Sequence, residues 1–97
     1  MNHQVQQTRA FAYWLLNLRD MRARIAIARR IDRLAAGNFG DFKSVGDCVS
    51  ELRIDIGAGY RVYFTLRDVS IVILLAGGDK STQPADIRQA KKMVKEI

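Results

Sequence analysis

The feature that most constrains the fold is a change in the spacing of apolar residues near Gly40. Before this glycine, apolar side chains recur every three or four positions, as they do along one face of an α-helix. After it, they alternate with polar side chains in residues 50–56 and 60–66, which is typical of strands that bury one face. Helices and strands therefore occupy separate stretches, and the chain is predicted to have an α+β fold.

Two helices are expected before Gly40. The apolar residues of the first share one face and are Phe11, Trp14, Leu15 and Leu18. The second spans about 20–36, with Asp20 as its N-cap and Gly37 as its stop signal. Only a residue or two separates these helices, so they are predicted to form a hairpin, preceded by a short edge strand within residues 3–8.

An antiparallel sheet and a final helix are expected after Gly40. Gly57, Ala58 and Gly59 suit a three-residue hairpin loop, and Asp68 marks the next turn. Residues 70–76 are apolar on both sides, which favours a well-covered strand. Ser81 or Thr82 can cap the last helix, and Pro84 suits its first turn. The predicted order is strand, helical hairpin, three or four strands and a C-terminal helix.

Composition limits the classes of protein to consider. The 97 residues are 48% hydrophobic, which predicts one domain over residues 1–97. No apolar run is long enough for a membrane helix, so a cytoplasmic protein without membrane contact is expected. The single Cys48 permits no internal disulfide, and no metal or cofactor is expected because no ligand cluster has suitable spacing. The net charge of +6 favours nucleic acid or an acidic protein as partner.

Strand geometry predicts which polar groups meet on the side of the sheet opposite the apolar residues. The pairs expected across the first hairpin are Asp55 with Arg61, Arg53 with Tyr63, and Glu51 with Thr65. A slip in this register changes the pairs and keeps the face. In the next hairpin Arg61 is expected opposite Ala76, so the segment that leaves that strand emerges beside Arg61.

This geometry predicts a cluster of cations. Gly77 and Gly78 are expected to turn the chain sharply at the strand end and to carry Lys80 to the face that holds Arg53 and Arg61. Lys43, in the stretch FKSVG, can add a fourth cation. Guanidinium and ammonium groups make charge-assisted hydrogen bonds to phosphate oxygens, so the four residues together predict a phosphate-binding face.

Several motifs resemble the toxins of the RelE/ParE superfamily, specifically the HigB-like group of addiction module killer proteins. They are ELRIDIGAGYRVYF (51–64), LLAGGDKSTQPADIRQA (74–90), WLLNLRD (14–20) and RIDRLAAGNFGDFKSVG (30–46). The resemblance covers nearly the whole chain. It implies a microbial RNase-like fold and a toxin that its cognate antitoxin neutralises. In ribosome-dependent members, the sheet binds and cleaves messenger RNA in the decoding site.

The resemblance also implies roles for residues. Arg61 matches the family's strand arginine, Arg53 a basic position on the preceding strand, and Lys80 the basic residue before the last helix, while Lys43 is a looser match. Relatives carry a late histidine or tyrosine for proton transfer, but here the sole histidine is His3 and no tyrosine follows residue 63. Glu51 is therefore a candidate base, or an ion-pair partner that orients an arginine, and Lys80 is a candidate acid.

Two functions from different classes fit these observations. One is a ribosome-dependent endoribonuclease, in which the 2′-hydroxyl of the messenger attacks its phosphodiester. The other is a ParE-like inhibitor that binds DNA gyrase and catalyses nothing. Convergence of the cations favours the nuclease, because a gyrase inhibitor has no need of it. In both cases the antitoxin is a partner, and the protein is expected to be a monomer alone and oligomeric with its antitoxin.

Overall fold

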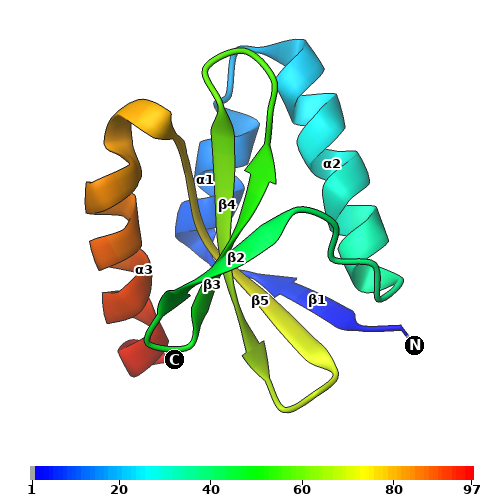
Figure 1. Cartoon of the computed structure of the whole chain (residues 1–97), viewed down its shortest axis with the longest axis vertical. Helices are drawn as coiled ribbons and strands as arrows, with labels where there is room; N and C mark the ends of the chain where they lie inside the picture. The colour runs from blue at the N-terminus through cyan, green and yellow to red at the C-terminus, as the bar shows by residue number, and fades with distance from the viewer. Residues whose placement is uncertain (1) are drawn as a thin grey trace.

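The computed structural model describes residues 2–97 (Figure 1). Its elements follow in the order β1 (Gln4–Gln7), α1 (Arg9–Leu16), α2 (Met21–Ala35), β2 (Phe42–Gly46), β3 (Val49–Ile54), β4 (Tyr60–Arg67), β5 (Ile71–Asp79), η1 (Lys80–Thr82) and α3 (Gln83–Glu96). This order confirms the predicted α+β fold with an N-terminal helical hairpin, a sheet and a C-terminal helix. None of the helices in this part of the chain is long and apolar enough to cross a membrane.

The sheet has five strands in the order β1-β5-β4-β3-β2. The strands β2 to β5 form the predicted antiparallel meander, and β1 is the predicted edge strand. No direction was predicted for this edge strand, and β1 pairs parallel with β5, Val5 opposite Val72. The polar alternation of β1 indicates an edge strand but carries no information about the direction of a partner so distant in sequence.

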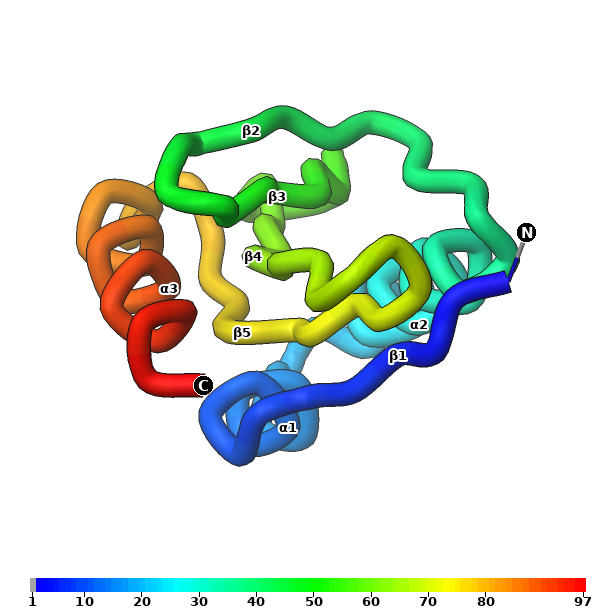
Figure 2. The backbone as a smooth tube through the Cα atoms, turned by 90° about the horizontal axis from the view of Figure 1, so that it is seen from below, coloured from blue at the N-terminus to red at the C-terminus, as the bar shows by residue number. Residues whose placement is uncertain are grey.

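Helices cover both faces of the sheet. Figure 2 shows α3 on one side and α2 on the other, with α1 beneath β5 and β1. The larger core lies under α1 and α2 and includes Phe11, Ile27, Leu34, Leu52, Val62 and Phe64. The smaller core lies under α3 and consists of Val49, Tyr63, Ile73, Leu75 and Ala90. The sheet face that was expected to be polar and open is therefore covered by α3 over part of its area.

The β3–β4 hairpin has a longer loop than the sequence predicts. Ile54 pairs with Tyr60, so residues 55–59 form the loop. The Gly59 N–H donates to the Ile56 carbonyl at 3.0 Å, which closes a tight turn inside this loop. The register differs by two residues from the symmetric three-residue loop, and Arg53 lies opposite Arg61 rather than Tyr63. A shift of two residues keeps every side chain on its predicted face.

The glycine pair near the end of β5 has a different role from the predicted one. Gly77 and Gly78 lie inside β5, and Gly78 lies opposite Arg61. The expected sharp turn does not occur at them. A Cβ on Gly77 would lie 2.2 Å from the Trp14 ring on one face of the sheet, and a Cβ on Gly78 would lie 1.9 Å from Asp86 Oδ2 on the other. Close packing of the Trp14 ring therefore requires a glycine at Gly77, whereas beside Gly78 only the ends of the Asp86 and Thr82 side chains lie close.

The last turn before α3 explains how Lys80 is placed. The Asp79 carboxylate accepts hydrogen bonds from the Ser81 N–H at 2.8 Å and from the Ser81 hydroxyl at 2.5 Å. These bonds hold the pKa of Asp79 below its usual value. They also form the short helix η1, from which α3 continues with a proline in its first turn, as predicted. Asp79 therefore caps this turn, and Lys80 is its first residue.

Candidate functional site

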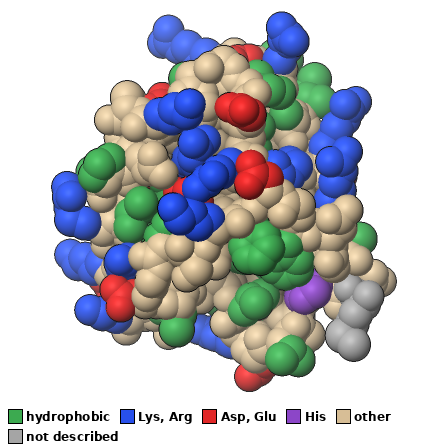
Figure 3. All heavy atoms as spheres, viewed as in Figure 1, with side chains coloured by type: hydrophobic (Ala, Val, Ile, Leu, Met, Phe, Trp, Pro, Cys, Tyr) green, Lys and Arg blue, Asp and Glu red, His purple; other side chains and the backbone are tan. Residues whose placement is uncertain are grey.

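The strand register brings three of the predicted cations onto one sheet face. Lys43 lies opposite Glu51 in the β2–β3 pair, and Arg53 lies opposite Arg61 in the β3–β4 pair. Residues directly opposite each other in an antiparallel pair point to the same face. Figure 3 shows Lys and Arg side chains gathered in the middle of the side on which β2 lies in front. We call Lys43, Arg53, Arg61 and Lys80 the cationic face.

Glu51 is the anchor of this face. Only 2% of Glu51 is exposed, and its Oε1 accepts a hydrogen bond from Arg53 Nε at 3.2 Å. Its Oε2 accepts a second from Gln83 Nε2, at 2.9 Å, from the first residue of α3. The prediction that Glu51 orients an arginine is confirmed for Arg53. Gln83 was not predicted, because no local pattern shows that the start of α3 would reach β3.

Arg61 is less accessible than its place in the alternating pattern indicates. Only 8% of the residue is exposed, because α3 covers this part of the sheet. Its Nη1 donates to the Tyr60 carbonyl at 3.1 Å, and its Nε is buried with no partner among the residues that the structure describes. The expectation that Arg61 stands on an open polar side is therefore wrong. A partly unsatisfied guanidinium in this setting retains donors for an anion.

Tyr63 is the second buried polar group of this face that sequence reasoning missed. It is fully buried, and within residues 2–97 its hydroxyl has no hydrogen-bond partner. Burial raises the pKa of this hydroxyl, and the nearby carboxylates of Glu51 and Asp86 raise the pKa further. At neutral pH Tyr63 therefore carries its proton. The alternation placed Tyr63 on the polar face with Arg61, but it gives no signal that this hydroxyl is buried without a partner in the described chain.

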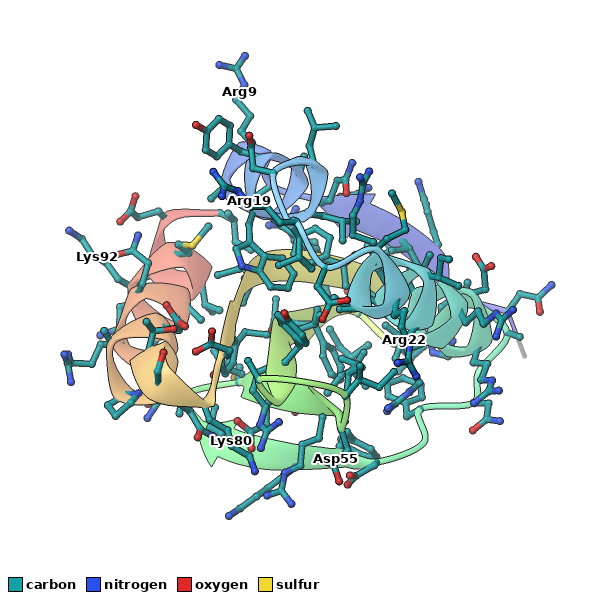
Figure 4. The ribbon with its side chains drawn as sticks, turned by 90° about the horizontal axis from the view of Figure 1, so that it is seen from above. Arg9, Arg19, Arg22, Asp55, Lys80 and Lys92 are labelled. Atoms are coloured by element: carbon teal, nitrogen blue, oxygen red, sulfur yellow. The ribbon has the colours of Figure 1, made fainter. Side chains whose placement is uncertain are left out.

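Lys80 lies at the end of the cationic face nearest the β3–β4 loop. It is exposed, and its aliphatic stem lies against Gly59, where an added Cβ would come within 2.9 Å of Lys80 Cε. In the described part of the chain no carboxylate lies within salt-bridge distance of its ammonium group. Figure 4 shows Lys80 on the same side of the molecule as Asp55 of that loop. The ammonium group is therefore free to contact a ligand.

These residues do not form a metal site. No group of three or more His, Cys, Asp and Glu side chains within residues 2–97 is arranged to hold a metal ion. Glu51 is committed to Arg53 and Gln83. What the cationic face offers is a set of donors with a net positive charge and one buried carboxylate, an arrangement that suits an anion such as a phosphodiester.

Comparison with known proteins places the chain in a family. A family model described as phage derived protein Gp49-like (DUF891) matches residues 13–96. The chain belongs to the Gp49-like family. This is a toxin-like, addiction-module family related to the RelE-type toxins, so the resemblance seen in the sequence is confirmed at that level. An uncharacterized protein of Haemophilus influenzae is 53% identical over 97 residues, which is 100% of this chain and 98% of the relative.

Proposed function

We propose that this Gp49-like protein is the toxin of a type II toxin–antitoxin module and inhibits translation by cleaving messenger RNA on the ribosome. The observation that carries the proposal is the cationic face, where Arg53, Arg61 and Lys43 share one side of the sheet around the buried Glu51. Membership of a toxin-like family supports it. The proposal implies a cytoplasmic protein, since messenger RNA is translated there.

The proposed reaction is an attack of the messenger's 2′-hydroxyl on the adjacent phosphodiester. The 2′-oxygen forms a bond to phosphorus, and the bond from phosphorus to the 5′-oxygen breaks, leaving a 2′,3′-cyclic phosphate and a 5′-hydroxyl. The 2′-hydroxyl loses a proton, and the 5′-oxygen gains one. Negative charge that builds up on the phosphorane requires fixed donors, which Arg53 and Arg61 supply.

The geometry favours particular roles within this reaction. Both oxygens of Glu51 already accept hydrogen bonds, from Arg53 and from Gln83, so we assign Glu51 to positioning of Arg53. Lys43 and Lys80 are exposed and are assigned to binding the phosphates of the messenger. Lys80 is also the proposed proton donor to the 5′-oxygen, because it is an exposed amine and no carboxylate of the described chain engages its ammonium group.

The proposal includes an antitoxin as partner. By itself the chain is proposed to be a monomer, and with its antitoxin an oligomer. The whole chain has 16 Lys and Arg against 10 Asp and Glu, so an acidic partner is electrostatically favoured.

Primer-extension mapping of cellular messenger RNA after brief induction tests the proposal. Wild-type protein is expected to produce cuts inside translated reading frames, and a purified ribosome assay should reproduce them. Lys80→Ala should lose these cuts. Lys92→Ala is the matched control, since Lys92 is an exposed α3 lysine that points away from the body of the molecule in Figure 4. Intact messages together with accumulating DNA breaks would instead support inhibition of DNA gyrase.

A further inference from the structure

An exposed aromatic side chain lies next to the cationic face. Among the residues that the structure describes, eight large hydrophobic side chains are exposed, and the aromatic ones are Tyr13 and Phe42. Tyr13 belongs to α1, whereas Phe42 is the first residue of β2 and directly precedes Lys43 of the cationic face. Phe42 is 49% exposed, so about half of its surface is not used in packing within the molecule.

The position of β2 in the sheet brings this ring and the cations to one open edge. The strand order leaves β2 at the edge, paired with β3 alone, and Figure 2 shows it outermost. Successive side chains of a strand point to opposite faces, so Lys43 and Phe42 flank the same edge strand. Figure 3 shows hydrophobic side chains beside Lys and Arg side chains on this side of the molecule. An extended ligand that leaves the cationic face across β2 therefore passes over the ring of Phe42.

Two other aromatic rings hold the ring of Phe42 in place. Its centroid lies 5.5 Å from that of Phe39 and 6.4 Å from that of Phe64, and the ring planes are tilted by 56° and 54°. These separations are those of favourable aromatic pairs. Phe64 belongs to the buried core, so the inner side of the Phe42 ring is fixed while its outer side stays open.

The chain between α2 and β2 is also fixed. The Arg30 Nη2 donates to the carbonyls of Phe39 at 3.3 Å and of Asp41 at 3.0 Å, and its Nη1 donates to the carbonyl of Arg53. Gly40 lies between them with φ +62°, and a Cβ there would lie 3.1 Å from the Arg30 Nη2. The segment that leads into β2 is therefore tied to the strand that carries Arg53. A surface ordered in advance loses little conformational entropy when a ligand binds.

We propose that a base of single-stranded RNA stacks on the exposed ring of Phe42 while the phosphates beside it bind the cationic face. Proteins that bind single-stranded RNA combine cations for its phosphates with aromatic rings for its bases. The inference rests on the proposed function for its ligand, the messenger, and adds where one base of that messenger lies.

The chemistry of the ring sets the selectivity of this contact. A phenyl ring has no hydrogen-bonding group, so it reads no base edge. Stacking strength alone then discriminates between bases, and purines, which have the larger face, should bind more tightly than pyrimidines at this position.

Two oligomers of equal length test the contact. One is an unstructured oligoribonucleotide, and the other has the same phosphates and sugars but no bases. Each is titrated at low salt into full-length protein with isotope-labelled phenylalanine, and NMR follows the ring signals of Phe42. The oligomer with bases should shift these signals, because a stacked base places its ring current over Phe42. The abasic oligomer should bind through its phosphates and leave them in place.

Phe42→Leu removes the aromatic face and keeps an apolar side chain against the core. It should weaken binding of the oligomer with bases by at least about fivefold. The slope of log affinity against log salt should stay unchanged, because no charge is lost, whereas Lys43→Ala should reduce that slope by about 0.7.

Two further variants separate stacking from an effect on folding. Phe42→Trp presents a larger aromatic face and should bind at least as tightly as the wild type. Tyr13→Leu is the matched control, since it removes the other exposed aromatic ring, on α1, and should bind as the wild type does. Thermal unfolding of each variant verifies the fold.

The outcomes distinguish this inference from the proposed function. Shifts at Lys43 and Arg53 without a shift at Phe42, or wild-type affinity in folded Phe42→Leu, would overturn stacking and leave RNA binding in place. No binding of either oligomer at low salt would overturn both. Stacking on Phe42 without cuts in cellular messages would support this inference and overturn cleavage alone.

Discussion

The two faces of the sheet are covered in different ways. Under α1 and α2 the buried side chains of the sheet are hydrophobic, among them Leu52, Val62 and Phe64, and the hydroxyl of Tyr60 is paired with Asp20. Under α3 the apolar cluster is smaller, and beside it the sheet buries Glu51, Arg61 and the hydroxyl of Tyr63. Two of these polar groups keep an atom without a partner in the described chain.

The difference indicates that the two faces have different roles. An apolar face stabilises the fold through burial alone, whereas buried polar atoms without partners cost free energy. A small domain has little stability to spare, so such atoms are retained where they serve a ligand. The face under α1 and α2 is thus the structural face, and the face under α3 is the one that we assign to function.

The largest expected effect comes from the structural face. Phe64→Ala should lower the free energy of unfolding by about 3 to 5 kcal/mol, because Phe64 is 2% exposed and packs against the rings of Phe39 and Phe42. Chemical denaturation measures this. Leu66→Ala on the same strand is the control, since Leu66 is 47% exposed and should change stability by less than about 0.5 kcal/mol. Equal losses of stability in the two variants would contradict the burial of Phe64 in this face.

Substitutions at Gly77 and Gly78 allow the two faces to be compared within one strand, because an added methyl group points to a different face at each position. Gly77→Ala should destabilise the protein by about 1 to 3 kcal/mol, because the added methyl group meets the rigid, packed ring of Trp14. Gly78→Ala meets the end of the Asp86 side chain and the Thr82 hydroxyl, which can rotate away. It should cost less stability while it disturbs the start of α3. Denaturation midpoints of both variants decide this, and a larger loss for Gly78→Ala would reverse the comparison.

Much of the fold could be predicted from the sequence because the signals are local. The change of hydrophobic period near Gly40 located the helices and strands, and Asp20 indeed caps α2 by accepting from the Ala23 N–H at 3.1 Å. Alternation along β3 and β4 also placed Arg53 and Arg61 on one face. The observed register differs by two residues from the expected one, and both arginines still lie on that face.

The rest depends on contacts between distant segments. Alternation distinguishes two faces but not what covers them, so the polar face was taken to be open although α3 packs there and buries Arg61. Glycine has several uses, and only the packed fold shows that Gly77 makes room for Trp14. Gln83 reaches Glu51 across 32 positions of sequence, and no local pattern encodes such a contact.

A smaller effect is expected from the functional face. Tyr63→Phe removes a buried hydroxyl that has no protein partner in residues 2–97, so the free energy of unfolding should rise by about 1 kcal/mol. Toxicity or RNA cleavage should fall if that hydroxyl serves the reaction. A stability loss of more than about 1 kcal/mol would show instead that the hydroxyl is satisfied in the folded protein.

The same variant has an expected dependence on pH. Burial raises the pKa of Tyr63 in the folded protein, while in the unfolded chain the hydroxyl titrates near pH 10. Above about pH 10 the unfolded chain therefore holds fewer protons than the folded one, and stability falls as the pH rises. Tyr63→Phe lacks this contribution. Its stability measured between about pH 9 and 11 should fall less steeply than that of the wild type, and parallel curves would contradict the burial of this hydroxyl.

The smallest effect on stability and the sharpest on function are expected at Lys80, which is exposed and makes no ion pair with the described carboxylates. Neither Lys80→Ala nor Lys80→Arg should shift the unfolding midpoint. If Lys80 donates a proton, Lys80→Arg should bind RNA and cleave poorly, because a guanidinium stays protonated at physiological pH. If Lys80 only binds phosphate, Lys80→Arg should cleave almost as the wild type does.

The salt dependence of RNA binding distinguishes both of these roles from a lysine that only faces solvent. Loss of one phosphate contact in Lys80→Ala should reduce the slope of log affinity against log salt by about 0.7 for single-stranded RNA. Asp79 does not occupy Lys80 in this structure, since its carboxylate accepts from Ser81 instead. Cleavage on programmed ribosomes by the Ala and Arg variants, measured beside this slope, distinguishes proton donor from phosphate ligand. Wild-type cleavage and an unchanged slope in Lys80→Ala would remove Lys80 from the cationic face and leave Arg53 and Arg61 as its centre.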